Sequence, residues 1–128
     1  MIIAMSIGNT NFVLGTKEDN HINVGRYPAK LIKSTEDFIK IITESTDIKK
    51  AEGIIISSVN PKLTSYLTEA VKIIFSLSPV IVDPNMKMKL DLSLYDTKLL
   101  GSDRIAVCEA AAGRYKEPAV IFDFGTAT

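Results

Sequence analysis

The apolar residues of this chain occur in short runs that are separated by small clusters of glycine and polar residues. Two such runs, Ile2–Met5 and Phe12–Thr16, flank a turn at residues 8–11 (GNTN), and we predict that they pair as a β-hairpin. A third, shorter strand is expected at Ile22–Tyr27. The first turn contains glycine, amides and a hydroxyl, so it offers hydrogen-bond donors without bulk, which suits a phosphate.

The remainder of the chain alternates between helical and strand patterns. A capping box that begins at Ser34 predicts a helix to about Ser45. The β-branched run at residues 54–56 predicts a buried parallel strand, and Pro61 suits the first turn of a helix that ends near Phe75. We also expect a short buried strand at Val80–Val82, a helix from Gly101 to about Gly113, and a last strand at Ala119–Phe122.

Three leading antiparallel strands followed by strand–helix alternation predict an α/β fold with a mixed sheet. The same order of elements is similar to that of ribonuclease-H-like domains in the sugar kinase, actin and Hsp70 superfamily. A shared topology does not by itself determine a function.

Composition narrows the classes of partner. The chain has 128 residues, of which 46% are hydrophobic, enough for one domain with a core. Its 15 basic and 15 acidic residues cancel, which argues against nucleic acid as the main partner. Its apolar runs are too short to span a membrane, and we expect no signal peptide. The single cysteine, Cys108, excludes an internal disulfide and favours a cytoplasmic location.

Three short motifs carry information beyond topology. They are residues 7–11 (IGNTN), residues 101–104 (GSDR) and residues 123–128 (DFGTAT), with residues 55–61 (IISSVNP) and 94–96 (LYD) between them. Each motif is weak alone. In this order and at this spacing, they make the chain resemble the N-terminal half of a type III pantothenate kinase over essentially its whole length.

The resemblance implies an activity. Members of this family transfer the γ-phosphoryl group of ATP to the 4′-hydroxyl of pantothenate, the first step of coenzyme A biosynthesis. It further implies a homodimer, a divalent metal such as Mg²⁺, and a monovalent cation, K⁺ or NH₄⁺.

The resemblance also implies roles for individual residues. The catalytic base would be Asp103, since a carboxylate can accept the proton of the attacking hydroxyl. Residues that bind pantothenate would be Tyr95, Gly101, Ser102 and Arg104, and the arginine suits a two-pronged bond to a carboxylate. Residues that bind ATP would be Ser6, Gly8, Asn9, Thr10, Asn11 and Thr126. The potassium ligand would be Asp123.

Each of these residues also has a purely structural interpretation. Ser102 and Asp103 could simply cap the helix that starts there. The turn at residues 8–11 could be an ordinary hairpin turn, Asp123 could satisfy loop amides, and Tyr95 could serve only in packing.

The chain departs from the family pattern at Ser6, where the pattern carries an aspartate beside the phosphates and the metal. Serine removes a negative charge and a ligand that Mg²⁺ favours, so we expect impaired handling of metal-bound ATP. This departure supports an alternative function, a non-catalytic homologue that serves as a binding or regulatory subunit. A third interpretation is a phosphotransferase of the same superfamily that acts on another small acid.

The second departure is length. We expect residues 1–117 to form the N-terminal, ribonuclease-H-like lobe, and residues 118–128 to form the first strand and phosphate turn of a second lobe that is absent from this chain. The strand at Ala119–Phe122 would then lack its neighbours and be an exposed edge. Because half of the nucleotide site would be missing, the chain alone should show little or no turnover.

Overall fold

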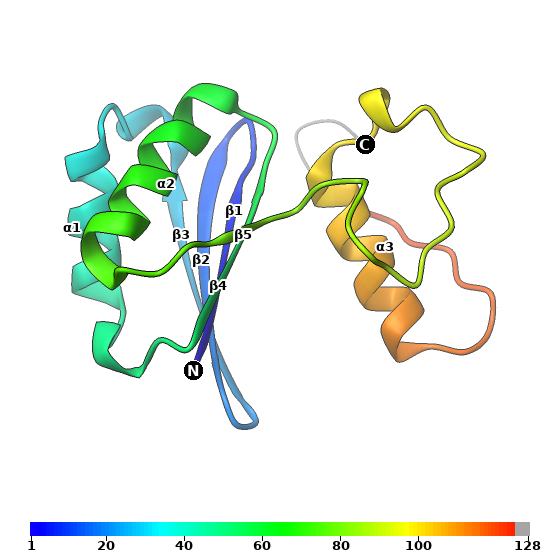
Figure 1. The fold of residues 1–128 in the computed structure, drawn as a ribbon, viewed down its shortest axis with the longest axis horizontal. Coiled ribbons are helices and arrows are strands. Elements are labelled where there is room, and N and C mark those ends of the chain that lie inside the picture. Colours follow the sequence, from blue (N-terminus) through cyan, green and yellow to red (C-terminus); the bar gives the residue numbers. More distant parts are fainter. Residues whose placement is uncertain (125–128) are drawn as a thin grey trace.

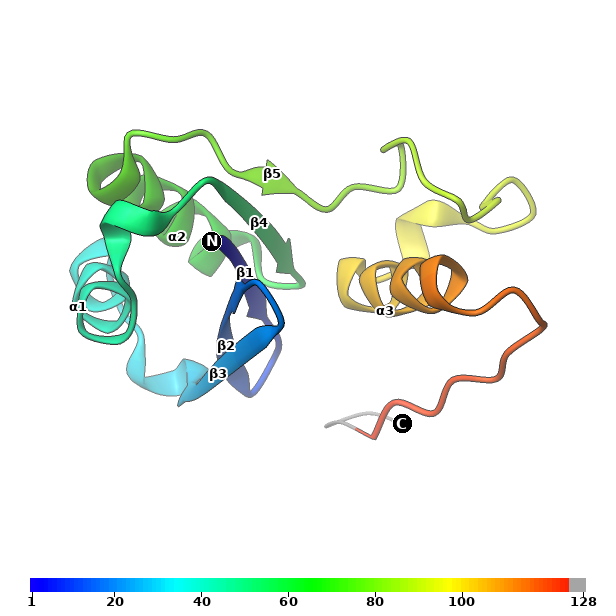
Figure 2. The ribbon, with the colours of Figure 1, turned by 90° about the horizontal axis from the view of Figure 1, so that it is seen from below.

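The computed structural model describes residues 1–124. Its body is a five-stranded sheet, with α1 (Thr35–Ser45) and α2 (Pro61–Phe75) on one face. Helix α3 (Ser102–Arg114) lies beyond the opposite face, as Figures 1 and 2 show from two directions. The chain reaches α3 through a long segment, residues 82–101, which contains the short 3-10 helix Thr97–Leu99. This arrangement confirms the predicted α/β fold with a mixed sheet and is consistent with a sugar kinase/actin-like fold.

The sheet has the strand order β3-β2-β1-β4-β5. Its strands are β1 (Ile2–Ile7), β2 (Asn11–Glu18), β3 (His21–Pro28), β4 (Gly53–Ser58) and β5 (Val80–Ile81). The pairs β1–β2 and β2–β3 are antiparallel, as predicted, whereas β4 runs parallel to β1 and β5 parallel to β4. The two ways of pairing therefore meet at β1, in the middle of the sheet.

The two faces of the sheet differ in chemistry because successive side chains of a strand point to opposite sides. One face is apolar and fully covered by α1 and α2, and its buried strand residues are Ile3, Met5, Ile7, Phe12, Leu14, Ile54 and Ile56. The core is completed from the helices by Phe38 and Ile42 of α1 and by Leu67, Ala70 and Val71 of α2. The other face carries smaller and more polar residues and stays open toward α3.

Local sequence signals determine where α1 and α2 begin. Ser34 and Asp37 form the predicted capping box: the N–H of Asp37 donates to Oγ of Ser34, and the N–H of Ser34 donates to the Asp37 carboxylate at 3.1 Å. At α2, Oδ1 of Asn60 accepts from the N–H of Leu63 at 3.1 Å, and Pro61 occupies the first helical position. Both caps satisfy backbone donors that a helix start leaves unpaired.

Two strand predictions were wrong. The strand predicted as buried at Val80–Val82 is the two-residue edge strand β5, and Val80 and Ile81 are 49% and 39% exposed. The segment Ala119–Phe122, predicted as a strand, forms none. Its apolar side chains are exposed, as expected for a segment without neighbours. A strand needs a neighbour to pair its backbone groups, and no other strand of the described residues lies beside this segment.

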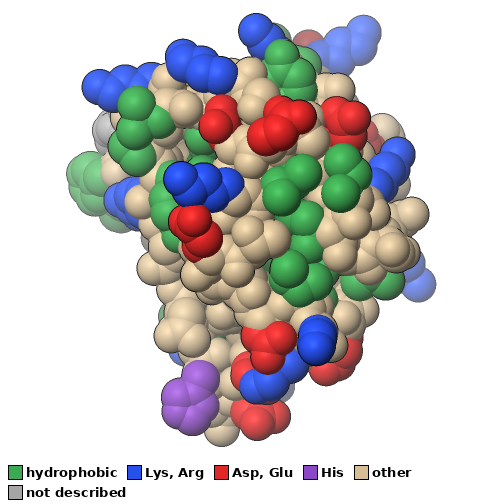
Figure 3. Space-filling model, turned by 90° about the vertical axis from the view of Figure 1, so that its left-hand side faces the viewer, with side chains coloured by type: hydrophobic (Ala, Val, Ile, Leu, Met, Phe, Trp, Pro, Cys, Tyr) green, Lys and Arg blue, Asp and Glu red, His purple; other side chains and the backbone are tan. Residues whose placement is uncertain are grey.

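The outer face of the helical layer has a mixed surface. Figure 3 shows positive and negative side chains interspersed over this face, with the histidine at one end of the molecule. No patch of one sign covers it, which agrees with the balanced composition. None of the helices in residues 1–124 combines the length and the hydrophobicity that a membrane-spanning segment requires.

The stability of the helical layer depends on an aromatic contact between α1 and β2. Phe12 and Phe38 are both fully buried, and their rings meet edge to face with centroids 5.0 Å apart. We predict that Phe38→Ala lowers the free energy of unfolding by about 3–5 kcal/mol, because it leaves a cavity at this contact. Urea denaturation measures the effect. The matched control is Leu31→Ala, at a side chain that is 66% exposed, and it should change stability by less than about 0.5 kcal/mol. Equal effects of the two substitutions would contradict this view of the core.

Candidate active site

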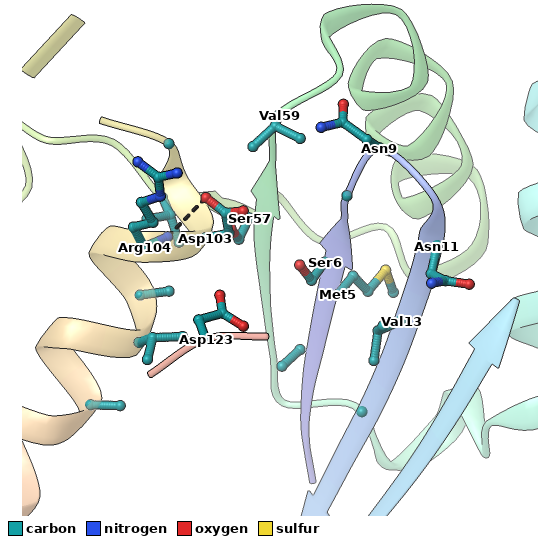
Figure 4. Close-up of a pocket in the computed structure, with 18 of the residues that line it drawn as sticks. Met5, Ser6, Asn9, Asn11, Val13, Ser57, Val59, Asp103, Arg104 and Asp123 are labelled. Carbon is teal, nitrogen blue, oxygen red and sulfur yellow. Dashed lines mark hydrogen bonds between the residues drawn. The ribbon is translucent and has the colours of Figure 1, made fainter. Parts of the chain in front are cut away.

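A cavity of about 780 Å³ separates the open face of the sheet from α3. Its first wall is the sheet together with the turn between β1 and β2, and its second wall is α3 with residues 123–124. Figure 4 shows Asn9, Asn11, Ser6 and Ser57 on the first wall, and Asp103, Arg104 and Asp123 on the second. Most of the predicted site residues, although far apart in sequence, therefore share one cavity.

The β1–β2 turn forms the end of the first wall. β1 ends at Ile7 and β2 begins at Asn11, and the N–H of Gly8 donates to the carbonyl of Asn11 at 2.9 Å. The turn is tied to the chain after β3, because the N–H of Ala29 donates to the carbonyl of Thr10 at 2.8 Å. Gly8 has a negative φ, and an added Cβ would make only an ordinary contact, 3.5 Å from the Asn11 carbonyl. Its backbone does not require glycine, so what glycine contributes here is open space in the cavity.

The open face of the sheet supplies a row of side chains across four strands. Ser57 of β4 is in register with Ser6 of β1, Ser6 with Val13 of β2, and Val13 with Arg26 of β3. All four residues line the cavity. The row places two hydroxyls, one apolar side chain and one guanidinium on the same wall.

The first turn of α3 presents the predicted base to the cavity. Oδ1 of Asp103 accepts from the N–H of Arg104 at 2.8 Å, and within the described residues Oδ2 has no protein partner. Gly101 precedes this turn, and a Cβ there would collide with Oδ1 of Asp103. Glycine at this position therefore leaves the room that the carboxylate occupies. Arg104, beside it, is exposed and lines the same cavity.

Unlike its neighbours, Ser102 uses its hydroxyl for hydrogen bonds to the end of β4. Its hydroxyl donates to the carbonyl of Ser58 at 2.8 Å and accepts from the N–H of Ser58 at 2.9 Å, and it lies 3.1 Å from Oγ of Ser57. These bonds join the first turn of α3 to the end of β4. Ser102 lines a second, smaller cavity rather than the main one, so its predicted contact with pantothenate stays a prediction.

Two other predicted residues lie outside the main cavity or outside the description. Tyr95 is 62% exposed in the segment between β5 and α3 and lines neither cavity. That segment is held to α3 by Glu109, whose carboxylate accepts from the N–H groups of Lys89 and Leu90 at 3.0–3.1 Å. Thr126 lies outside the described residues. The roles predicted for both therefore stay predictions.

The described part of the cavity contains oxygen ligands but no preformed cage for a metal. Among the residues that the structure describes, Asp103 and Asp123 are the carboxylates that line it, beside the hydroxyls of Ser6 and Ser57. Within residues 1–124, no group of three or more His, Cys, Asp or Glu side chains could hold an ion. This donor set fits a hard cation such as Mg²⁺, which keeps several waters and is bound through one or two carboxylates and the phosphates of its substrate.

Comparison with known proteins gives the lineage of this site. The family model described as type III pantothenate kinase matches residues 2–128. The chain belongs to the type III pantothenate kinase family. A curated type III pantothenate kinase from Exiguobacterium sp. (strain ATCC BAA-1283 / AT1b) is 33% identical over 134 aligned positions, which cover 100% of this chain and 53% of that protein. The chain thus spans about half the length of this relative.

Sequence reasoning missed two polar residues of the first wall, Arg26 and Ser57. One signal for Arg26 was available: Ile22 and Val24 alternate along β3, and the next position of that alternation is a charged residue. Alternation places all three on one face of the strand, and only the fold shows that this face borders the cavity. Ser57 directly follows the apolar run at residues 54–56. That position indicates only the end of a strand, so the sequence carries no signal that Ser57 lines the cavity.

We predict that Ser102→Ala loosens α3, because it leaves the N–H and carbonyl of Ser58 without their partner. A loss of about 1–3 kcal/mol in the free energy of unfolding is expected, together with faster amide hydrogen exchange in the first turns of α3. The control is Ser65→Ala on the exposed side of α2, which should change stability by less than about 0.5 kcal/mol. Unchanged exchange in α3 would show that these bonds do not hold the helix.

Proposed function

We propose that this chain is the N-terminal part of a kinase that transfers the γ-phosphoryl group of ATP to the 4′-hydroxyl of pantothenate. One observation carries the proposal: the β1–β2 turn and Asp103 border the same cavity, although they are far apart in the sequence. The proposed residues for the nucleotide phosphates are Ser6, Gly8, Asn9, Thr10, Asn11 and Thr126. Those for pantothenate are Tyr95, Gly101, Ser102 and Arg104.

The arrangement supports a direct transfer between the two walls. Oδ2 of Asp103 accepts the proton of the attacking hydroxyl while that oxygen bonds to the γ-phosphorus. The bond from the γ-phosphorus to the bridging oxygen breaks, and ADP leaves with that oxygen. Arg104 stands one residue beyond the base and is exposed, so it is placed to pair with the carboxylate of pantothenate. Positioning and charge neutralisation supply most of the rate in such reactions.

Two cations belong to the proposal. Asp103 and the hydroxyl of Ser6 are the candidates to orient water around Mg²⁺, and Asp123 is the candidate ligand for K⁺ or NH₄⁺. A bound divalent cation would neutralise charge on the phosphates during transfer. The homodimer and the cytoplasmic location implied by the resemblance stay predictions.

The proposal includes a division of the chain. Residues 1–117 would form the first lobe, and residues 118–128 would begin a second lobe that closes over the nucleotide. The exposed side chains of Val120, Phe122 and Phe124, each more than three-quarters exposed, support this division, because they would be buried by such a lobe.

The base is tested by Asp103→Asn in a chain that includes the second lobe. We expect kcat for phosphopantothenate formation to fall by roughly 10²–10⁴, because the amide cannot accept the proton, with little change in pantothenate binding. Mass spectrometry of the product and calorimetric titration provide the two measurements. The control is Asp19→Asn, in the β2–β3 turn, where φ is 51° and asparagine fits equally well. Full activity of Asp103→Asn would remove the base from this proposal.

The role of Ser6, the serine of β1 on the first wall, is tested by adding a carboxylate. Ser6→Asp, in the same longer chain, should raise kcat/KM for Mg²⁺-bound ATP roughly tenfold, because it adds a carboxylate next to the phosphates. Steady-state assays at several Mg²⁺ concentrations measure it. The control is Ser65→Asp, which adds the same charge on the exposed side of α2, outside the cavity lining. No gain with Ser6→Asp would show that the serine does not limit the use of ATP.

The alternative function, a non-catalytic binding or regulatory subunit, is favoured by Ser6 alone. If neither the unsubstituted longer chain nor its Ser6→Asp variant forms phosphopantothenate, and the chain copurifies with an active kinase, this alternative replaces the proposal. Activity of the unsubstituted longer chain excludes it.

A further inference from the structure

The charged residues of the cavity are divided between its two walls. Asp103, Arg104 and Asp123 come from α3 and the segment after it. Among the described residues that line the cavity, the sheet contributes one ionisable side chain, Arg26 of β3. The wall that carries the β1–β2 turn is therefore cationic, whereas both carboxylates stand on the opposite wall.

No contact within residues 1–124 explains why position 26 carries a positive charge. Its side chain is exposed, and within residues 1–124 it makes no ion pair or side-chain hydrogen bond. The core beneath β3 is formed by the opposite face of the strand, where the ring of Tyr27 packs near Phe12 with centroids 6.0 Å apart. Its guanidinium keeps all five donors for a ligand.

The register of the sheet places Arg26 in one row with Ser6, at the end of β1 that leads into the β1–β2 turn. Arg26, Val13 and Ser6 lie on adjacent strands in one row, so about 10 Å separates the α-carbons at the ends of the row. The arginine side chain is long enough to extend over Val13, whose small side chain leaves its path open. From this row the guanidinium can reach the space above Ser6, which lies two residues before Gly8. In this chain that position carries a neutral hydroxyl, so no carboxylate of the same wall competes for the guanidinium.

We propose that Arg26 binds the polyphosphate of the nucleotide from the sheet side of the cavity. This inference rests on the proposed function for the identity of the nucleotide and adds a residue to its binding site. Arginine pairs with phosphate oxygens through two parallel hydrogen bonds. Its position orients the substrates: the anionic phosphates lie on the sheet wall, and the acceptor alcohol lies on the wall of Asp103. Arg26 is thus a substrate-binding residue whose charge acts on the nucleotide rather than on pantothenate.

The test compares Arg26→Gln and Arg26→Lys with a matched control in a chain that includes the second lobe. The control is Lys17→Gln, which removes a positive charge from the face of β2 that also carries Val13. Lys17 lies about 13 Å along the strand from Val13 and does not line the cavity. Calorimetric titration with inorganic triphosphate and with ATP measures binding, and steady-state assays measure both KM values. Thermal unfolding without ligand checks that each variant is folded.

We expect Arg26→Gln to weaken triphosphate and ATP binding roughly 10- to 100-fold, with the KM for ATP raised to match and that for pantothenate unchanged. Arg26→Lys should give an intermediate loss, because it keeps the charge but not the paired donors. Lys17→Gln should change binding less than about twofold, as expected for a screened surface charge.

The outcomes separate this inference from the function on which it rests. If the unsubstituted protein phosphorylates pantothenate, and the Arg26→Gln variant binds ATP as tightly as the unsubstituted protein, only the inference about Arg26 is overturned. If the unsubstituted protein binds triphosphate but does not act on pantothenate, the proposed function fails, and the binding ratio still decides the role of Arg26. If it binds neither ATP nor triphosphate, both are overturned.

Discussion

The alternation of side chains along β1 is the constraint on which the rest of this structure depends. Ile3, Met5 and Ile7 point into the core, so Ala4 and Ser6 must point to the open face. A shift of one residue in register would exchange these sets, burying the serine and exposing three large apolar side chains. The burial of the apolar set against α1 and α2 thereby also places the polar row at the cavity. Core packing and site geometry are consequences of the same pattern.

The second wall of the cavity depends on fewer contacts. α3 is joined to β4 through the hydroxyl of Ser102, and its one buried side chain is Ile105. Asp103 lies between these two residues, so the bonds that hold the helix also determine where its carboxylate stands. Both carboxylates that line the cavity among the described residues stand on this wall together with Arg104, whereas the charged side chain of the sheet wall is Arg26. The two walls therefore differ in charge.

Much of the fold was predictable because its signals are local. The capping box at Ser34, the proline at position 61 and the β-branched run at residues 54–56 each specify an element through neighbouring residues, and each element formed as predicted. The errors share a cause. Whether Val80–Val82 is buried, and whether Ala119–Phe122 is a strand, depends on which segments lie beside them. Backbone pairing partners are not encoded in the segment itself.

The sequence by itself determined the family and the order of elements as far as α3, because motifs and periodicity can be recognised along one dimension. It also singled out Asp103, Arg104 and the β1–β2 turn, which the fold then brought to one cavity. Only the tertiary structure decided that Arg26 lines this cavity and that Tyr95 does not. It also decided that the hydroxyl of Ser102 bonds to β4. These facts depend on register across strands and on how α3 packs. Such contacts join residues that are distant in the chain, so no local pattern specifies them.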